Sequence, residues 1–358
     1  MIDARSDVVG SLLRPQALLA ARERGDPEAL RAAEDEAVDE ALRRQAEAGL
    51  QVVTDGEMRR LSFQSQMVEA VDGFGDWDLD AFLWGDWKSD VVGDLELEQP
   101  PLAVRSRLRR RRFLSADELD YALPRTDRVL KVTLPSPGLF SQFWDERGST
   151  DAYATLEDFL WAVAAILREE VEELAHRGAT YLQLDAPHYP LLLDERWRSF
   201  YERRGSVETW LELDNHVIDA APGGVTVGFH LCRGNQGSRW LVEGSYESLA
   251  ERIFPRIHAD RLLLEYDDER SGGFEPLRHV PEDRTVVLGL VTTKTPRREA
   301  PDELATRIGD AGRFVPLEHL AVSPQCGFGT SVVGNALSEA DQWAKLQTVA
   351  ETARKVWG

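Results

Sequence analysis

The two cysteines of this chain both lie where they could bind a metal ion. Cys232 follows His230 by two positions in an apolar run of β-type residues, "VTVGFHLC" (225–232). Because alternate residues of an extended strand share a face, the two side chains should point to the same side. Cys326 lies in "PQCGFG" (324–329), where glycine permits a tight turn that could present the sulfur atom to a pocket. Zinc prefers thiolate and imidazole ligands in a tetrahedral arrangement, and Glu265 in the next β-type run could complete a set of four.

Each of these residues also has an ordinary structural interpretation. A histidine can be a hydrogen-bonded core residue, and a buried cysteine can pack as a small hydrophobic side chain. A disulfide between Cys232 and Cys326 is geometrically possible, but two cysteines in 358 residues argue against a disulfide scaffold and suit a reducing cytoplasm. The spacing alone therefore leaves the zinc site and the structural interpretation open.

The elements that would position these residues are eight β-type runs separated by helical patterns. The runs occupy residues 7–13, 51–57, 128–134, 180–185, 225–232, 261–267, 285–291 and 317–326. The helical patterns occupy residues 27–49, 155–178, 245–259, 301–312 and 338–356. Apolar strands that alternate with helices are typical of a parallel sheet buried on both faces, and eight such units predict an α/β fold, a (β/α)8 TIM barrel. An open doubly wound sheet is the alternative, but no Gly-x-Gly-x-x-Gly motif follows the first run.

Residues 62–125 interrupt this alternation with a segment rich in tryptophan, glycine and aspartate. We interpret the segment as a long insertion after the second strand, a hairpin excursion or lid over the barrel mouth, within a single domain of residues 1–358. It contains the one concentrated basic stretch, "RSRLRRRR" (105–112). We expect this stretch to be a solvated helix face or a set of local salt-bridge partners.

The charge of the chain excludes several classes of partner. Its 42 basic and 63 acidic residues leave a formal net charge of −21, which disfavours nucleic acid and anionic membrane as partners. The longest apolar run, 159–167, is far too short to cross a bilayer, and the first residues contain no long apolar stretch typical of a secretory signal. We therefore expect a soluble, cytoplasmic, acidic α/β protein.

Polar residues stand at the ends of other predicted strands as well. Ser11, Glu57 and Asp185 lie at or near the ends of the first, second and fourth runs. Active sites of barrels lie at the carboxyl ends of the strands, so these side chains should converge on the face that holds the candidate zinc ligands. Taken singly, Ser11 and Asp185 could be turn or cap residues, and Glu57 could be a carboxylate that interacts with backbone N–H groups at a helix start.

The chain resembles the C-terminal catalytic half of cobalamin-independent methionine synthase, and more closely the short, single-barrel relatives of that enzyme. The resemblance runs over nearly the whole chain, with seven motifs in the same order. They are "VVGSLLRP" (8–15), "TDGEMRR" (54–60), "YLQLDAPHY" (181–189), "HLCRGN" (230–235), "LLLEYDDERSGGFEPL" (262–277), "LGLVTTK" (288–294) and "SPQCGFGTS" (323–331).

The resemblance implies a set of roles for the residues above. It makes His230, Cys232, Glu265 and Cys326 the ligands of Zn2+. It also implies that Glu57 and Asp185 bind the amino group of an amino-acid thiol, and that Ser11 binds its carboxylate. The implied activity is zinc-dependent transfer of a methyl group to that thiol, in particular to homocysteine to give methionine. Because two thiolates and a glutamate would make the zinc centre anionic, a bound thiolate should stay electron-rich, and we expect the incoming sulfur to displace Glu265.

Two departures from the family leave the methyl donor open. If the donor is methyl-tetrahydrofolate, the departing nitrogen needs a proton, and the full-length enzymes have a histidine after strand seven for this purpose. Here Lys294 stands near that place in "LVTTKTP", and His188 is a second candidate, although Lys294 could also be a solvated loop residue. The long enzymes also have an N-terminal half, without a counterpart in these 358 residues, that helps bind the glutamate tail of the folate. A corrinoid such as methyl-cobalamin is therefore an alternative donor.

Two other functions compete with methyl transfer. The same zinc barrel resembles epoxyalkane:coenzyme M transferases, but binding a sulfonate requires cationic residues, and residues 105–112 are the only loose support. A non-catalytic zinc-binding barrel would not need Ser11, Glu57 and Asp185. The three residues together favour the methyltransferase.

Overall fold

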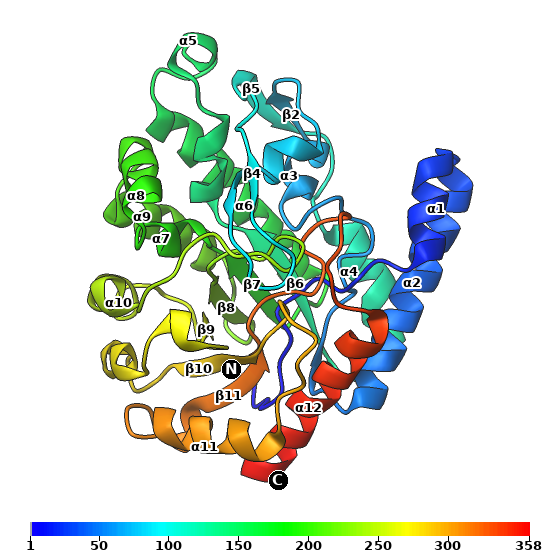
Figure 1. Cartoon of the computed structure of the whole chain (residues 1–358). Helices are drawn as coiled ribbons and strands as arrows, with labels where there is room; N and C mark the ends of the chain where they lie inside the picture. Colours follow the sequence, from blue (N-terminus) through cyan, green and yellow to red (C-terminus); the bar gives the residue numbers. More distant parts are fainter. Residues whose placement is uncertain (1) are drawn as a thin grey trace.

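The computed structural model describes residues 2–358, and a curled, seven-stranded parallel sheet lies at its centre (Figure 1). The strands of this sheet, in spatial order, are β1 Val52–Val53, β6 Val129–Pro135, β7 Tyr181–Asp185, β8 Thr226–Leu231, β9 Arg261–Glu265, β10 Thr285–Val291 and β11 Leu320–Pro324. From β7 to β11 every strand residue is buried, which explains why these strands are apolar along most of their length. The prediction of an α/β fold built on a parallel sheet is confirmed.

The predicted first strand, residues 7–13, is wrong. Only Ser6 forms a parallel bridge, with Val322 of β11, and the chain has left the ladder by residue 8. The Asp7 N–H donates to the Val322 carbonyl at 2.9 Å and the Val52 N–H donates to the Ser6 carbonyl at 3.3 Å. This short segment therefore lies between the two edge strands, β11 and β1.

Side chains take the backbone groups that a longer strand would have paired with a neighbouring strand. The Val8 N–H donates to the Asp7 carboxylate at 2.8 Å, and Lys131 donates to the Val8 carbonyl. The Val9 carbonyl accepts from the side-chain amide of Gln183 at 2.9 Å. These bonds satisfy the backbone without a ladder, so the apolar run does not become a strand.

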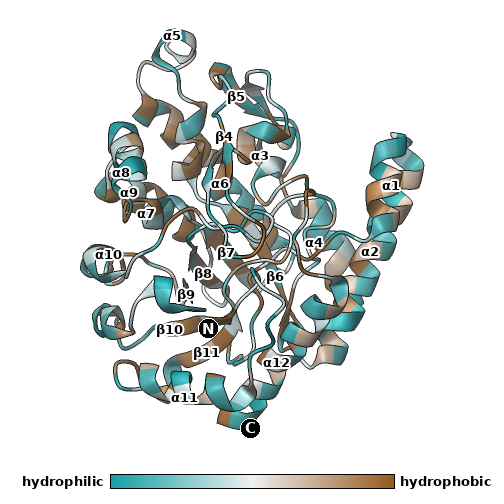
Figure 2. Ribbon diagram, in the orientation of Figure 1, coloured by the Kyte–Doolittle hydropathy of each residue, from teal (hydrophilic) through white to brown (hydrophobic). Residues whose placement is uncertain are grey.

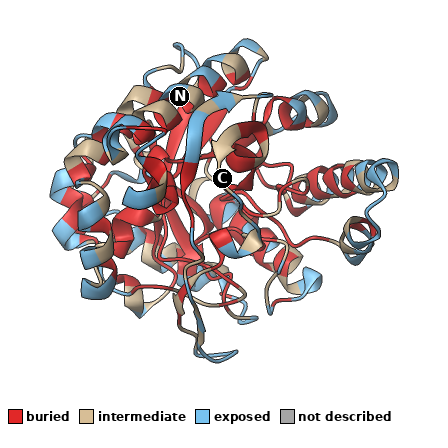
Figure 3. Ribbon diagram, turned by 90° about the horizontal axis from the view of Figure 1, so that it is seen from above, coloured by how far each residue is buried: buried red, intermediate tan, exposed pale blue. Residues whose placement is uncertain are grey.

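The helices surround the sheet (Figure 1). The α-helices are α1 Gln16–Arg24, α2 Pro27–Ala48, α3 Ser65–Ala70, α4 Ala116–Ala122, α5 Glu146–Ser149, α6 Leu156–His176, α7 His188–Leu191, α8 Glu195–Tyr201, α9 Val207–Ile218, α10 Glu247–Ile253, α11 Pro301–Ala311 and α12 Glu339–Trp357. Short 3-10 helices lie at Leu79–Phe82, Leu123–Arg125, Pro137–Phe143, Glu202–Arg204, Glu269–Ser271, Glu275–His279 and Leu317–His319. Apolar residues gather on the strands and on the helix sides that face them (Figure 2), and the same inner faces are buried when the molecule is seen from above (Figure 3).

Local sequence signals set the ends of these helices. The Thr155 hydroxyl accepts from the Asp158 N–H, and the Asp158 carboxylate accepts from the Thr155 N–H, so α6 begins with a capping box as predicted. The helix predicted at 245–259 is shorter than expected. It ends at Ile253, although Phe254 still has a helical conformation, because Pro255 has no backbone N–H with which to continue the helical hydrogen bonds.

The segment between β1 and β6 contains two antiparallel strand pairs. One pairs β2 (Val71–Phe74) with β5 (Val104–Arg110), and the other pairs β3 (Gly85–Trp87) with β4 (Leu95–Leu97). The basic stretch 105–112 is therefore mostly strand, which corrects the expected helix face. Its expected local ion pairs are present: Arg109 and Arg111 both contact Asp72, and Arg110 contacts Glu169.

Among residues 2–358, no helix combines the length and the apolar character needed to cross a bilayer.

Candidate functional site

Three of the predicted zinc ligands meet at one edge of the sheet. His230 lies near the end of β8, Cys232 follows that strand, and Cys326 follows β11. Each offers one ligand atom, and these three atoms all lie within 4.8 Å of one another. All three side chains are buried. Because β8 and β11 run parallel, their carboxyl ends bring residues that are distant in sequence to the same edge.

The hydrogen bonding of His230 leaves one ring nitrogen free for a metal ion. Its Nδ1 atom lies 3.2 Å from the carbonyl oxygen of Leu263. A carbonyl only accepts, so Nδ1 carries the hydrogen and Nε2 keeps its lone pair. Nε2 is buried without a hydrogen-bond partner anywhere in residues 2–358. Buried polar atoms normally have partners, so an unpaired nitrogen beside two sulfur atoms fits a zinc ligand.

The two sulfur atoms interact with each other and with the histidine. A hydrogen bond from Cys326, assisted by His230, holds the pKa of Cys232 well below its usual range despite burial. The same hydrogen bond, together with burial, raises the pKa of Cys326 well above its usual range. Of the two thiols, Cys232 is thus the one that loses its proton more readily. A metal cation in place of the shared proton would leave two thiolate ligands.

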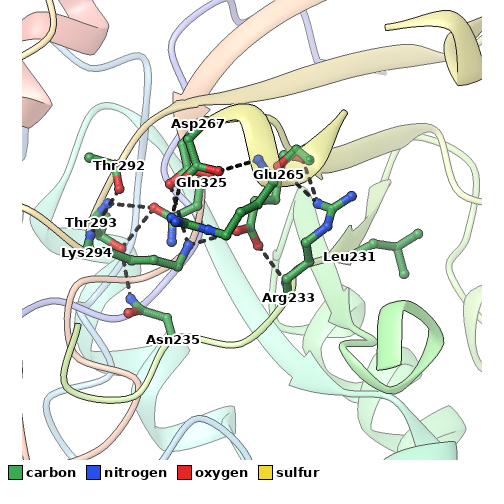
Figure 4. Close-up of polar contacts among 12 residues, drawn as sticks. Leu231, Arg233, Asn235, Glu265, Asp267, Thr292, Thr293, Lys294 and Gln325 are labelled. Carbon is green, nitrogen blue, oxygen red and sulfur yellow. Dashed lines mark hydrogen bonds and ion pairs between the residues drawn. The ribbon is translucent and has the colours of Figure 1, made fainter. Parts of the chain in front are cut away.

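Glu265, the fourth predicted ligand, does not belong to this group of three. It ends β9 and is buried, and both of its carboxylate oxygens are bound elsewhere (Figure 4). Oε1 accepts from Lys294 Nζ at 2.8 Å, and Oε2 accepts from the backbone N–H of Arg233 at 2.6 Å. Burial raises the pKa of Glu265, and the cation of Lys294 opposes this effect. The structure therefore places Glu265 as the partner of a lysine.

The predicted substrate residues line one cavity together with the three metal-binding candidates. The cavity has a volume of about 980 Å³, part of it open to solvent, and its wall includes Ser11, Glu57, Asp185, His230, Cys232 and Cys326. The structure thus brings together six of the nine residues that the sequence singled out for ligand binding or chemistry. Concave sites with a few convergent polar groups are typical of small-molecule binding.

Glu57 offers an unpaired carboxylate oxygen in this cavity. Its backbone has φ 56°, a left-handed conformation that is rare outside glycine. Its Oε1 atom accepts from the Thr133 hydroxyl at 2.7 Å, whereas Oε2 is buried without a hydrogen-bond partner in the described chain. Strained backbone and unpaired buried oxygens both concentrate at functional sites, so Glu57 is suited to bind a cationic group.

Asp185 is positioned by a chain of buried polar side chains. Its Oδ1 atom accepts from Gln183 at 2.7 Å, and Gln183 in turn accepts from Lys131 Nζ at 2.6 Å. Lys131 is fixed by Asp7 at 2.9 Å. Burial raises the pKa of Asp185 to about 7, although nearby His230 and the hydrogen bond from Gln183 act in the opposite direction. A bound cation would restore the ionised form of this carboxyl group.

Ser11 lies directly against the turn that carries Cys326. The Phe328 N–H donates to the Ser11 carbonyl at 2.8 Å. A Cβ atom on Gly327 would overlap the Ser11 hydroxyl, so glycine is required for this close approach. Direct contact between these two segments therefore fixes the position of Ser11 relative to Cys326.

The two predicted proton donors lie away from the cavity wall. In the part of the chain that the structure describes, the lining residues include neither His188 nor Lys294. His188 packs against Tyr189 and Trp210, with ring centroids 4.5 and 4.8 Å apart, and burial lowers its pKa to about 3. Lys294 is buried against Glu265. The structure thus places neither of the two in the described wall of the cavity.

An aromatic wall completes the cavity, and sequence analysis did not identify its members. It consists of Phe63, Phe82, Trp84, Trp87, Trp197 and Tyr201. Four of them come from residues 62–125, whose density of tryptophan and phenylalanine was the available signal. No lysine or arginine within residues 2–358 belongs to the cavity wall. The described cavity wall therefore combines aromatic and acidic residues and contains no basic one.

Known proteins resemble this chain over nearly its whole length. Residues 16–345 match the family described as "Cobalamin-independent synthase, Catalytic domain". The uncharacterized protein YxjG of Bacillus subtilis is 37% identical, over 99% of this chain and 94% of that protein. A methionine synthase of Pyrococcus abyssi is 25% identical, over 90% of this chain and 85% of its own. A solved structure of a B12-independent methionine synthase from Shewanella sp. W3-18-1, in complex with selenomethionine, shares the fold, with a TM-score of 0.76, 21% identity, and coverage of 99% of this chain and 98% of that one.

Proposed function

The chain belongs to the family of cobalamin-independent synthase catalytic domains, and we propose from this that it is a zinc-dependent methyltransferase that methylates a small thiol, homocysteine, to give methionine. One observation carries the proposal. A His-Cys-Cys group and two carboxylates, Glu57 and Asp185, line the same cavity. A metal-storage protein would need the first group only.

The donor set fits zinc. His230, Cys232 and Cys326 would hold the ion, since they supply one imidazole with an unpaired nitrogen and two sulfur atoms. We propose Glu265 as a fourth ligand when no thiol is bound. Zinc would lower the pKa of a substrate thiol so that it is a thiolate, and thus a nucleophile, at neutral pH.

The residues of the chain would bind and orient the amino-acid part of the thiol. We propose that Glu57 and Asp185 bind its ammonium group, because both carboxylates lie in the cavity wall and Glu57 has a free oxygen. Ser11 would bind its carboxylate, next to the turn of Cys326. The aromatic wall would pack against the methyl donor and exclude water from the reacting atoms.

Two parts of the fold support this site, the segment at residues 5–7 and the segment at residues 62–125. We propose that residues 5–7 close the curled sheet into a barrel, supported by their bonds to β11 and β1. We further propose that residues 62–125 form a lid within a single domain, because Phe82, Trp84 and Trp87 of this segment line the cavity. A reducing compartment such as the cytoplasm suits the two free cysteines.

Homocysteine should change the metal coordination. X-ray absorption of the zinc-loaded protein is expected to detect about two sulfur ligands without homocysteine and three with it, with the loss of one oxygen or nitrogen ligand. The reason is that both cysteines already contribute sulfur and that Glu265 is the ligand with an alternative partner. An unchanged coordination sphere at saturating homocysteine would contradict activation of the thiol by the metal.

The methyl donor should not depend strongly on a folate polyglutamate tail. In the described chain the cavity wall lacks lysine and arginine, and several arginines of the basic stretch 105–112 are engaged in local ion pairs, so an anionic tail finds little to bind. The measurement is kcat/KM with mono- and triglutamyl methyl-tetrahydrofolate at low and moderate salt.

One outcome would contradict this independence from the polyglutamate tail, and another would indicate a different methyl donor. A preference for triglutamate of about a hundredfold, abolished when Arg109–Arg112 are neutralised, would show that the basic stretch binds the tail. Turnover with methyl-cobalamin but with neither folate would indicate a corrinoid donor, which the description of the family does not support.

A further inference from the structure

Lys294 lies between two buried carboxylates, those of Glu265 and Asp267 (Figure 4). Its Nζ atom donates to Glu265 at 2.8 Å and lies 3.5 Å from an oxygen of Asp267. The side chains of Lys294, Glu265 and Asp267 are all buried. Lys294 is therefore the cation that neutralises Glu265 in this structure.

Asp267 provides Lys294 with a second negatively charged neighbour, which would remain in place if Glu265 left the lysine to bind a metal ion. Neither carboxylate oxygen of Asp267 has a hydrogen-bond partner among residues 2–358, so Lys294 is its nearest source of positive charge. A buried charge without a partner is costly, and this arrangement avoids that cost in two states. If Glu265 were bound to a metal ion, Lys294 would still face Asp267. In this structure Lys294 contacts both carboxylates.

The loop of Lys294 is tied to the elements that present the metal-binding candidates. The Thr293 N–H donates to the side chain of Gln325 at 2.6 Å, one residue before Cys326. Asn235 donates to the Thr293 hydroxyl at 2.8 Å and to the Gly327 carbonyl at 2.7 Å. Lys294 is thus fixed relative to the turn of Cys326.

We propose that Lys294 is a positioning residue: it binds the Glu265 carboxylate whenever that carboxylate is not a metal ligand. The ligand position that Glu265 gives up is then open to the sulfur atom of the substrate. The carboxylate exchanges one cation for another, so no covalent bond changes and no charge is left unpaired. This inference rests on the proposed function, and it replaces the role of proton donor that the sequence suggested for Lys294.

The test compares Lys294→Met with a lysine that supports the same loop without touching Glu265. Lys345 is buried and pairs with Glu299 at 3.2 Å, and Glu299 accepts from the Thr292 N–H. Lys345→Met is therefore the matched control for a general disturbance of the loop. Lys294→Gln, which keeps a hydrogen-bond donor but loses the charge, is the second variant if Lys294→Met does not fold.

Zinc content, ligand counts from X-ray absorption, and homocysteine affinity are measured for each zinc-loaded protein. The Lys294 variants are expected to bind zinc fully, to keep the oxygen ligand when homocysteine is added, and to bind homocysteine about tenfold more weakly than the wild type. Lys345→Met should match the wild type in ligand counts and in homocysteine affinity. In a Glu265→Ala background, Lys294→Met should cause no further loss of affinity, because Lys294 acts through Glu265.

The outcomes that overturn the inference differ from those that overturn the function. Normal ligand exchange in the Lys294 variants, an equal loss in Lys345→Met, or a full Lys294 effect without Glu265 would each refute the positioning role while leaving the function intact. Failure of the wild type to take up homocysteine sulfur at the metal would refute the proposed function itself.

Discussion

Cys326→Ser should abolish zinc binding and methyl transfer while the protein keeps its fold. The Cys326 sulfur is one of three donor atoms within 4.8 Å of one another, and a serine hydroxyl is not deprotonated at neutral pH. Cys326 lies beyond the end of β11, so the ladder hydrogen bonds of that strand do not involve it. Zinc content by elemental analysis and the thermal unfolding curve of the metal-free protein are the measurements.

Two histidine variants, one inside the group of three donor residues and one outside it, test whether the loss of zinc is specific to this site. His230→Gln should lose zinc in the same way, because its Nε2 atom is the unpaired donor. His258→Gln should retain zinc, because His258 is exposed and pairs with Asp219. Full zinc occupancy in a Cys232→Ala, Cys326→Ala double variant would show that the metal does not bind here.

The sequence predicted that His230, Cys232 and Cys326 would lie together, because strand periodicity determines where their side chains point. The two-residue spacing of His230 and Cys232 places both side chains on one face, and parallel strands bring Cys326 to the same edge. Asp185, at the end of β7, lies at the cavity for the same reason, whereas Ser11 and Glu57 line it from segments outside the strands. Predictions from strand alternation are reliable because the direction of each side chain along a strand depends on the backbone alone.

Where the structure differs from what the sequence suggested, contacts between side chains that are distant in sequence are the cause. Residues 7–13 have the pattern of a strand, but Lys131 and Gln183 compete for their carbonyl groups. Nothing near Lys294 in the sequence indicates that Glu265 and Asp267 enclose it. His188 follows a strand end, as an active-site histidine would, but aromatic rings bury it.

Asp185→Ala should sharply weaken homocysteine binding without loss of zinc. Asp185 lines the cavity with His230, Cys232 and Cys326 but is not part of their group, so with the proposed roles the substitution would remove only a partner of the substrate ammonium. Removing one partner of a buried charge contact typically costs about 2–5 kcal/mol. Calorimetric titration of the zinc-loaded variants with homocysteine measures this change.

Asp214 offers a matched control for Asp185, and coenzyme M tests the identity of the thiol. Burial raises the pKa of both carboxyl groups to about 7, but Asp214 binds Ser136 and Tyr189 and does not line the cavity. Asp185→Asn should therefore weaken homocysteine binding, whereas Asp214→Asn should leave it unchanged.

Because Glu57 and Asp185 form an acidic wall, they attract an ammonium group and repel a sulfonate, so the wild type should turn over homocysteine in preference to coenzyme M. Equal or better turnover with coenzyme M would contradict an amino-acid thiol as the acceptor and favour the epoxide-opening relatives.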